Sequence, residues 1–144
     1  MSGVVDYFRI AEGEALPAIA DHAPFRAVVV IDASYSTGWQ KDVSDWLVLS
    51  GCVYMMAWGK DCSSWDDSVD YANRDAFSCG EIPDEKFVMT TWHERQGLDD
   101  VFWQAQFAAD HPDVALTGTL ILHISNKEAG DEFLARFMAA RDQI

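Results

Sequence analysis

Short apolar runs alternate along this chain with segments of helical periodicity. The runs cover residues 25–32, 52–58, 86–92 and 117–124. Each is continuous and rich in Val, Ile, Met or aromatic residues, which is typical of strands buried on both faces. After the first run, Trp39, Val43 and Leu47 recur four residues apart, as on one face of a helix. The other three runs are followed by the same change of period, so the pattern predicts βαβαβαβα.

This alternation predicts an α/β fold. We expect a small, mainly parallel sheet of four strands with helices on both faces, Rossmann-like or flavodoxin-like, joined by right-handed crossovers. Numbering the four strands in chain order, we favour the order 2-1-3-4 over 3-2-1-4. Residues 1–24 are ambiguous, because "VVDYFRI" could add a fifth strand at the edge and "ALPAIADH" a helical turn. A length of 144 residues fits a single domain.

Capping residues and tryptophans refine the expected helices. Hydroxyl side chains that accept from the first free N–H groups mark helix starts. Three starts are predicted from Thr37 with Gln40, from Ser63 or Ser64 with Asp66 and Asp67 in the first turn, and from Ser125 with Glu128. The tryptophans on helix stripes, Trp39, Trp46 and Trp103, are expected in the core.

The chain is strongly acidic. It has 24 acidic and 10 basic residues, a net charge of −14. Such a charge repels nucleic-acid phosphates and anionic membranes, so neither is expected as a direct partner. Residues 60–113 alone hold 13 acidic and 4 basic side chains, which places the acidic field in the middle of the chain. A basic partner protein is the natural complement.

The termini and cysteines indicate a location. The N-terminal stretch lacks a basic segment followed by an apolar one, and no run of about 18 apolar residues could span a membrane. The three cysteines, Cys52, Cys62 and Cys79, form no CxxC pair, which suits reduced thiols. We expect a cytoplasmic protein.

Polar and aromatic side chains gather where the predicted strands end. In an open parallel sheet the carboxyl ends of the strands share one edge, and ligands bind in a crevice there. The residues that we expect at this edge are Asp32, Ser34, Trp58, Lys60, Asp61, Cys62, Trp92, His93, Glu94 and His123. The opposite ends of the strands carry no comparable set. The carboxyl edge is therefore the predicted site.

Four of these residues could perform acid–base or ligand chemistry. Asp32, directly after a buried strand, is predicted to act as an acid or cation ligand, with Asp61 as its companion. His93 would act as a base, oriented by Glu94. The alternative is structural, because an Asp after a strand can cap a loop and a His-Glu pair can open one.

The remaining edge residues have other candidate roles. A thiol before a helix N-terminus is activated by the helix dipole, so Cys62 could be a nucleophile, although nearby aspartates oppose this. Lys60 and Ser34 could bind an anionic group, and Trp58 or Trp92 could stack on a flat ligand. His123, inside an apolar run, is expected to be a hydrogen-bonded core histidine. No metal or cofactor motif is present, so the cofactor is not predicted.

Two sequence blocks carry a family resemblance. "YMMAWGKDCSSWDDSVD" and "KFVMTTWHE" resemble blocks of an uncharacterised family of small bacterial proteins, and the resemblance spans roughly residues 25–125. It implies a bacterial cytoplasmic protein. It carries no activity, catalytic residue or cofactor, so the site prediction depends on the sheet edge alone.

Two functions of different classes follow. The first is a polar pocket at the carboxyl edge that binds a small ligand, with a nucleotide-like molecule as a candidate and hydrolytic chemistry as an option. The second is an acidic interaction module, of the immunity or inhibitor type, that binds a basic partner protein with fast, salt-dependent association. Whether the protein is an enzyme, and its oligomeric state, stay open.

Overall fold

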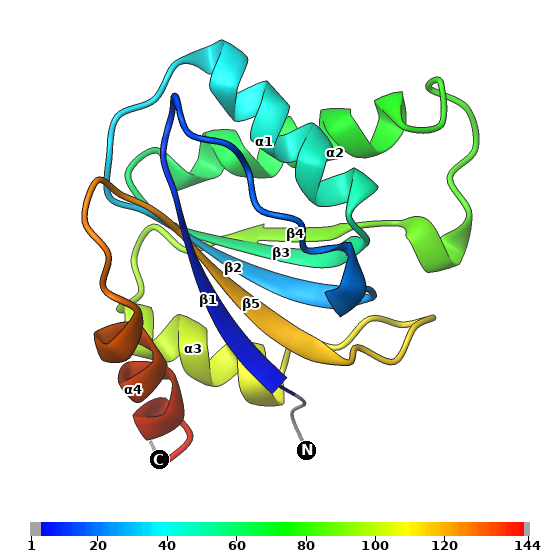
Figure 1. The fold of residues 1–144 in the computed structure, drawn as a ribbon. Coiled ribbons are helices and arrows are strands. Elements are labelled where there is room, and N and C mark those ends of the chain that lie inside the picture. Colours follow the sequence, from blue (N-terminus) through cyan, green and yellow to red (C-terminus); the bar gives the residue numbers. More distant parts are fainter. Residues whose placement is uncertain (1–3, 143–144) are drawn as a thin grey trace.

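Five parallel strands form one sheet in the computed structural model, which describes residues 4–142 (Figure 1). The strands are β1 (Val4–Ile10), β2 (Phe25–Ile31), β3 (Cys52–Gly59), β4 (Met89–Trp92) and β5 (Gly118–Ile124), and their order is β1-β5-β2-β3-β4. The predicted α/β fold with a parallel sheet is confirmed. The additional edge strand that "VVDYFRI" could form is β1, which lies beside β5.

The favoured strand order is wrong and its alternative is correct. In the numbering used for the four apolar runs, the sheet follows 3-2-1-4. The chain steps from β2 to β3 to β4 in one direction and then returns to β5 on the far side of β2. A right-handed crossover that reverses direction must cover the opposite face of the sheet. The order therefore depends on which face each helix covers, which no single segment encodes.

The helices cover both faces of the sheet (Figure 1). They are α1 (Thr37–Leu49), α2 (Cys62–Asp75), α3 (Leu98–Phe107) and α4 (Gly130–Ala140), with two short 3-10 helices, η1 (Ala20–His22) and η2 (Asp84–Lys86). The pair α1 and α2 lies on one face, and the pair α3 and α4 on the other. No helix among residues 4–142 has the length and apolar character needed to cross a bilayer.

Each face of the sheet has its own apolar core. Trp39, Leu47, Trp65 and Val69 cover one face, and Phe102, Phe133 and Phe137 cover the other. All seven residues of β2 are buried, because this central strand is covered on both sides. That double burial explains why its sequence is apolar throughout rather than alternating.

The helix starts differ from the predicted caps. Ser36 caps α1, its Oγ accepting from the Trp39 N–H at 3.2 Å, so the cap lies one residue before Thr37. Asp61 is the N-cap of α2, which places Ser63 and Ser64 inside the helix and Asp66 and Asp67 beyond its first turn. Ala129, rather than Ser125, is the N-cap of α4. The packing of the helices on the sheet sets these starts, and the observed caps lie one to four residues from the predicted ones.

One tryptophan differs from expectation. Trp39 is buried and Trp46 is half-buried against the same core, as predicted. Trp103 is 37% exposed, beside Phe107 on the outer side of α3. An apolar residue close to a helix stripe is therefore not always covered.

Candidate functional site

The carboxyl ends of β2 and β5 meet at the point where the strand order reverses. The residue directly after β2 is joined to the last residue of β5, since the Asp32 N–H donates to the Ile124 carbonyl at 2.9 Å. The chain leaves β2 toward one face and β5 toward the other, so the two loops diverge. A crevice at such a reversal is the usual ligand position in open α/β sheets.

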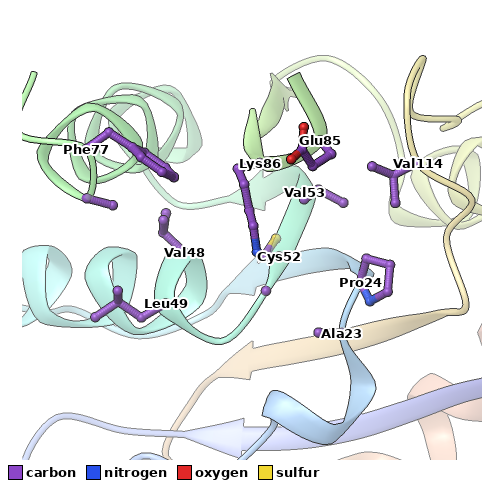
Figure 2. Close-up of a pocket in the computed structure, with 12 residues that line it drawn as sticks. Ala23, Pro24, Val48, Leu49, Cys52, Val53, Phe77, Glu85, Lys86 and Val114 are labelled. Carbon is purple, nitrogen blue, oxygen red and sulfur yellow. The ribbon is translucent and has the colours of Figure 1, made fainter. Parts of the chain in front are cut away.

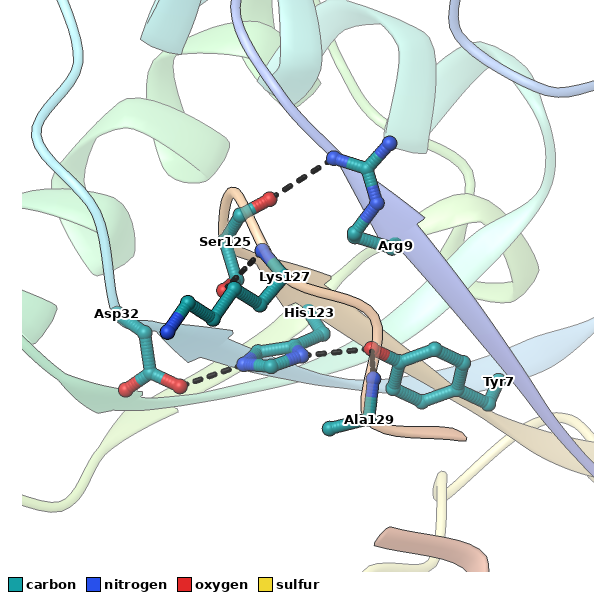
Figure 3. Close-up of polar contacts among 7 residues, drawn as sticks. All are labelled: Tyr7, Arg9, Asp32, His123, Ser125, Lys127 and Ala129. Atoms are coloured by element: carbon teal, nitrogen blue, oxygen red, sulfur yellow. Dashed lines mark hydrogen bonds and ion pairs between the residues drawn. The ribbon is translucent and has the colours of Figure 1, made fainter. Parts of the chain in front are cut away.

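A buried histidine links three strands at this point (Figure 3). The His123 side chain on β5 is only 4% exposed. Its Nε2 lies 2.5 Å from Asp32 Oδ2, after β2, and its Nδ1 lies 2.6 Å from Tyr7 Oη on β1. We call Tyr7, His123 and Asp32 the relay. Its members lie 91 and 116 residues apart in the chain, so only the strand order brings them together.

The hydrogen-bond pattern of the relay assigns its protons. A carboxylate only accepts, so the ring proton of His123 lies on Nε2 and donates to Asp32 Oδ2. In this tautomer His123 Nδ1 accepts from the Tyr7 hydroxyl, whose oxygen accepts from the Ala129 N–H at 3.0 Å. Burial raises the pKa of Tyr7, the Ala129 N–H offsetting this in part, so the hydroxyl stays protonated.

Aromatic packing fixes the histidine ring. His123 lies 4.3 Å from the Phe133 ring of α4, centroid to centroid, and 5.7 Å from the Tyr7 ring. Tyr7 in turn meets Phe133 edge-on at 5.9 Å. The ring is therefore held by both hydrogen bonds and packing. Because Asp32 is bonded to this ring, its carboxylate is also held in one orientation, although its side chain is 45% exposed at the surface.

The loop after β5 is held in place from β1. Arg9 Nη1 donates to the Ser125 carbonyl at 3.0 Å, while its Nη2 pairs with Glu14 at 2.8 Å. Ser125 Oγ accepts from the Lys127 N–H at 3.1 Å. In Figure 3 the Lys127 side chain extends from this loop on the side of Asp32. The edge strand β1 thus supports both the relay and the loop beside it.

Ser34 and Lys60 lie together on the neighbouring loops. Lys60 Nζ donates to Ser34 Oγ at 3.1 Å, and the Lys60 N–H donates to the Ile31 carbonyl at 3.0 Å. The backbone at residues 59–60 can approach Ile31 this closely because residue 59 is glycine. Gly59 has φ +109°, and a Cβ at this position would lie 2.5 Å from the Ile31 oxygen. A positive charge and a hydroxyl are therefore positioned next to the loop that follows Asp32.

An acid of the chain itself occupies the start of α1. Glu12 accepts from the Ser36 N–H at 2.8 Å and from its Oγ at 2.5 Å. These bonds lower the pKa of Glu12. In related folds the loop between the corresponding strand and helix holds a phosphate. Here the Glu12 carboxylate already accepts from the N–H and the hydroxyl of Ser36 in this loop.

His93 lies at the other end of the same edge, after β4. Two strand spacings of about 4.8 Å separate β4 from β2, so His93 is not beside Asp32. Its Nε2 bonds Thr91 Oγ1 at 2.9 Å and its Nδ1 bonds Gln96 Oε1, both on its own strand or loop. Glu94 is exposed and does not orient the ring. These hydrogen bonds hold the β4–α3 loop in place. Trp58 Nε1 also holds the loop, since it donates to the Gln96 carbonyl at 2.7 Å.

The other predicted residues are dispersed. Cys62 is 1% exposed in the core under α2, while Asp61 is exposed at the helix start with φ 53°. Trp92 is 48% exposed on the edge strand. Within residues 4–142 there is no group of three His, Cys, Asp or Glu side chains suited to a metal ion. Of the predicted set, the structure joins Asp32 to His123 and Ser34 to Lys60.

Sequence reasoning missed the relay. Tyr7 lies in the ambiguous segment 1–24, and the sequence predicts His123 as a core residue, which its burial supports. One signal was present in the sequence: a histidine near the end of one apolar run and an aspartate at the end of another. Only the adjacency of β2 and β5 makes that signal meaningful.

The match to known proteins extends over almost the whole described chain. Residues 5–140 match a protein family described as a domain of unknown function, DUF7684. This chain belongs to DUF7684. No curated protein and no solved structure matches it. The expected membership of an uncharacterised family is confirmed, and the DUF7684 region includes all three residues of the relay.

Proposed function

We propose that this chain binds a small polar ligand at the carboxyl edge of the sheet, with Asp32 as the residue that contacts it. The observation that supports the proposal is the relay. A half-exposed carboxylate is held from behind by a buried histidine, which is itself held by a half-buried tyrosine hydroxyl. Three strands thus orient one surface group, as expected of a preorganised contact.

The relay favours a ligand that donates hydrogen bonds. With the ring proton on Nε2, His123 occupies Asp32 Oδ2 and leaves the other carboxylate oxygen as an acceptor. A hydroxyl pair of a sugar or an amino group would supply such donors. A bare anion would be repelled by the same carboxylate.

Lys60 and Ser34 provide the second contact. Their paired side chains lie on the loops beside Asp32 and offer a positive charge together with a hydroxyl. An anionic group on the ligand would bind there rather than at the start of α1, because Glu12 already accepts from Ser36. A donor-bearing part and an anionic part describe a nucleotide-like or sugar-phosphate ligand.

Binding is better supported than hydrolysis. The thiol of Cys62 is buried away from the edge, and both ring nitrogens of His93 are already bonded. Hydrolytic chemistry stays a prediction. We further propose a bacterial cytoplasmic location, in line with the three free cysteines.

A ligand panel tests this proposal. The panel contains adenosine, adenosine monophosphate, ribose 5-phosphate and glucose, each followed by thermal unfolding and by amide chemical shifts. A ligand present at 100 times its Kd stabilises the native state by about 2.7 kcal/mol. We expect at least one phosphorylated member to raise the Tm and to shift amides in residues 32–36 and 125–129.

Matched variants locate the binding. Asp32→Asn removes the charge at the site, and Asp100→Asn removes one from the exposed side of α3. Asp32→Asn should abolish the Tm shift while Asp100→Asn retains it. Tyr7→Phe keeps the ring but frees His123 Nδ1, so we expect weaker binding together with altered His123 ring ¹⁵N shifts. The proposal fails if no panel member binds, or if Asp32→Asn binds as well as the natural chain.

A further inference from the structure

An apolar cavity lies at the opposite edge of the sheet, near the amino ends of β2 and β3 (Figure 2). Its volume is about 570 Å³, and its walls include Pro24, Val48, Leu49, Val53, Phe77 and Val114. Two charged residues, Glu85 and Lys86, stand on one side and carry opposite charges. The cavity is large enough for a bulky apolar side chain.

The cavity continues into a groove between α1 and α2. One hollow of about 400 Å³ lies between the middle of the two helices. A smaller hollow shares Lys41, Asp45 and Asp75 with it and shares Val48, Leu49 and Ala76 with the apolar cavity. The three spaces therefore form one path. Along α2 this path runs from Ser64 to Ala76, about 18 Å at 1.5 Å per residue.

The groove is acidic. Asp45, Asp67 and Asp75 line it. Lys41 is the one basic residue of its lining, and its Nζ is already paired with Asp45 Oδ2 at 2.7 Å. The groove thus attracts cationic side chains, in the field of a chain whose net charge is −14.

Apolar side chains are exposed along the same path. Leu49 is 78% exposed where the groove meets the cavity, and Tyr71 is 62% exposed on α2. Leu49 lines both the apolar cavity and the smaller hollow, and Tyr71 lines the hollow between the two helices, so both side chains belong to this path. One continuous surface therefore offers an apolar pocket at one end and carboxylates along its length.

We propose that this groove binds a basic, amphipathic segment of a partner protein. A bulky apolar residue of the segment enters the cavity, and its lysine or arginine side chains pair with Asp45, Asp67 and Asp75. Apolar anchors in a pocket with charged contacts around them are typical of helix-in-groove recognition. The path accommodates about twelve residues of helix, or five to six of extended chain. This surface is separate from the ligand site at Asp32.

Two synthetic peptides of equal length test the charge requirement. One is an amphipathic helix of leucine and lysine, and the other replaces each lysine with glutamate. We expect the lysine peptide to bind and to shift amides of α1 and α2, and the glutamate peptide not to bind. The affinity of the lysine peptide should fall at least about tenfold between low and high salt, because exposed charge pairs are screened.

Two triple variants test the location. Asp45→Asn, Asp67→Asn and Asp75→Asn together raise the net charge by three and should weaken binding at least about tenfold. Asp100→Asn, Asp113→Asn and Asp131→Asn change the net charge equally at exposed positions outside the groove, and should weaken it less than about threefold. Equal weakening by both sets would overturn the proposal, since the attraction would then be general.

Leu49→Ser tests the apolar contact. Leu49 is exposed, so its replacement should leave the fold intact while weakening the lysine peptide about tenfold. Asp32→Asn should leave peptide binding unchanged, which separates this proposal from the ligand site. Unchanged peptide affinity in Leu49→Ser would contradict the anchoring role of the cavity.

Discussion

Two buried histidines lie at the carboxyl edge of this sheet, and they differ in what they connect. His93 bonds Thr91 and Gln96, two and three residues away in the chain. His123 bonds Asp32 and Tyr7, which are 91 and 116 residues away. The first histidine holds one loop together. The second joins three strands and orients a carboxylate that reaches solvent.

The comparison shows why residue type alone misled the site prediction. At both ends a histidine near a strand end has its two ring nitrogens occupied, and both rings are buried. Only the partners differ: an amide and a hydroxyl at β4, a carboxylate and a phenol at β5. A histidine with local partners stabilises its loop, whereas one with distant partners couples the fold to a surface group.

The largest expected effect is that of His123→Ala. This change removes a ring packed on Phe133 and leaves Tyr7 and Asp32 without their partner. We expect the free energy of unfolding to fall by about 2–4 kcal/mol, measured by urea denaturation. Tyr7→Phe, which keeps the ring packing, should lower it by about 1 kcal/mol. A loss below about 1 kcal/mol for His123→Ala would show that the relay does not connect the strands.

His93→Ala should have a smaller and more local effect. It removes two hydrogen bonds of the β4–α3 loop, so we expect a loss of about 1–2 kcal/mol. Hydrogen exchange should accelerate in residues 93–97 and stay unchanged in 125–129. His123→Ala should show the opposite pattern. Loss of protection at both loops in His93→Ala would mean that the two ends of the edge are coupled.

The smallest expected effect concerns Asp70, which faces β4 from α2. Burial raises the pKa of Asp70, although its Oδ1 accepts from Thr90 Oγ1 at 2.9 Å. A raised pKa means that the folded state disfavours the ionised form. The associated stability is present below the ordinary pKa of 3.8 and is lost as the pH rises through the folded-state pKa.

Asp70→Asn should therefore stabilise the fold near neutral pH. The amide oxygen can still accept from Thr90. The free energy of unfolding should rise by about 0.3 kcal/mol, a small gain because solvent screens much of the charge of Asp70. The gain should disappear in urea denaturation at about pH 3, where the carboxyl is protonated in both states. An equal loss of stability at both pH values would contradict this account.

The strands and helices could be predicted from the sequence more fully than the residues of the site. The apolar run at 25–32 predicted β2 because burial on both faces leaves a local record in the sequence. Asp32 was placed at the carboxyl edge for the same reason. Its partner could not be found in this way, because His93 follows one apolar run, His123 lies inside another, and the local pattern does not show which of them lies beside Asp32.

By itself the sequence determined the α/β class, the parallel strands and the edge at which polar side chains gather. These follow from periodicity, which depends only on neighbouring residues and their burial. Only the tertiary structure decided that β5, rather than β4, lies beside β2, and that β1 completes the sheet beside β5. That choice depends on which face each helix covers. Because such packing is set by contacts between distant segments, the union of Tyr7, His123 and Asp32 exists only in the folded chain.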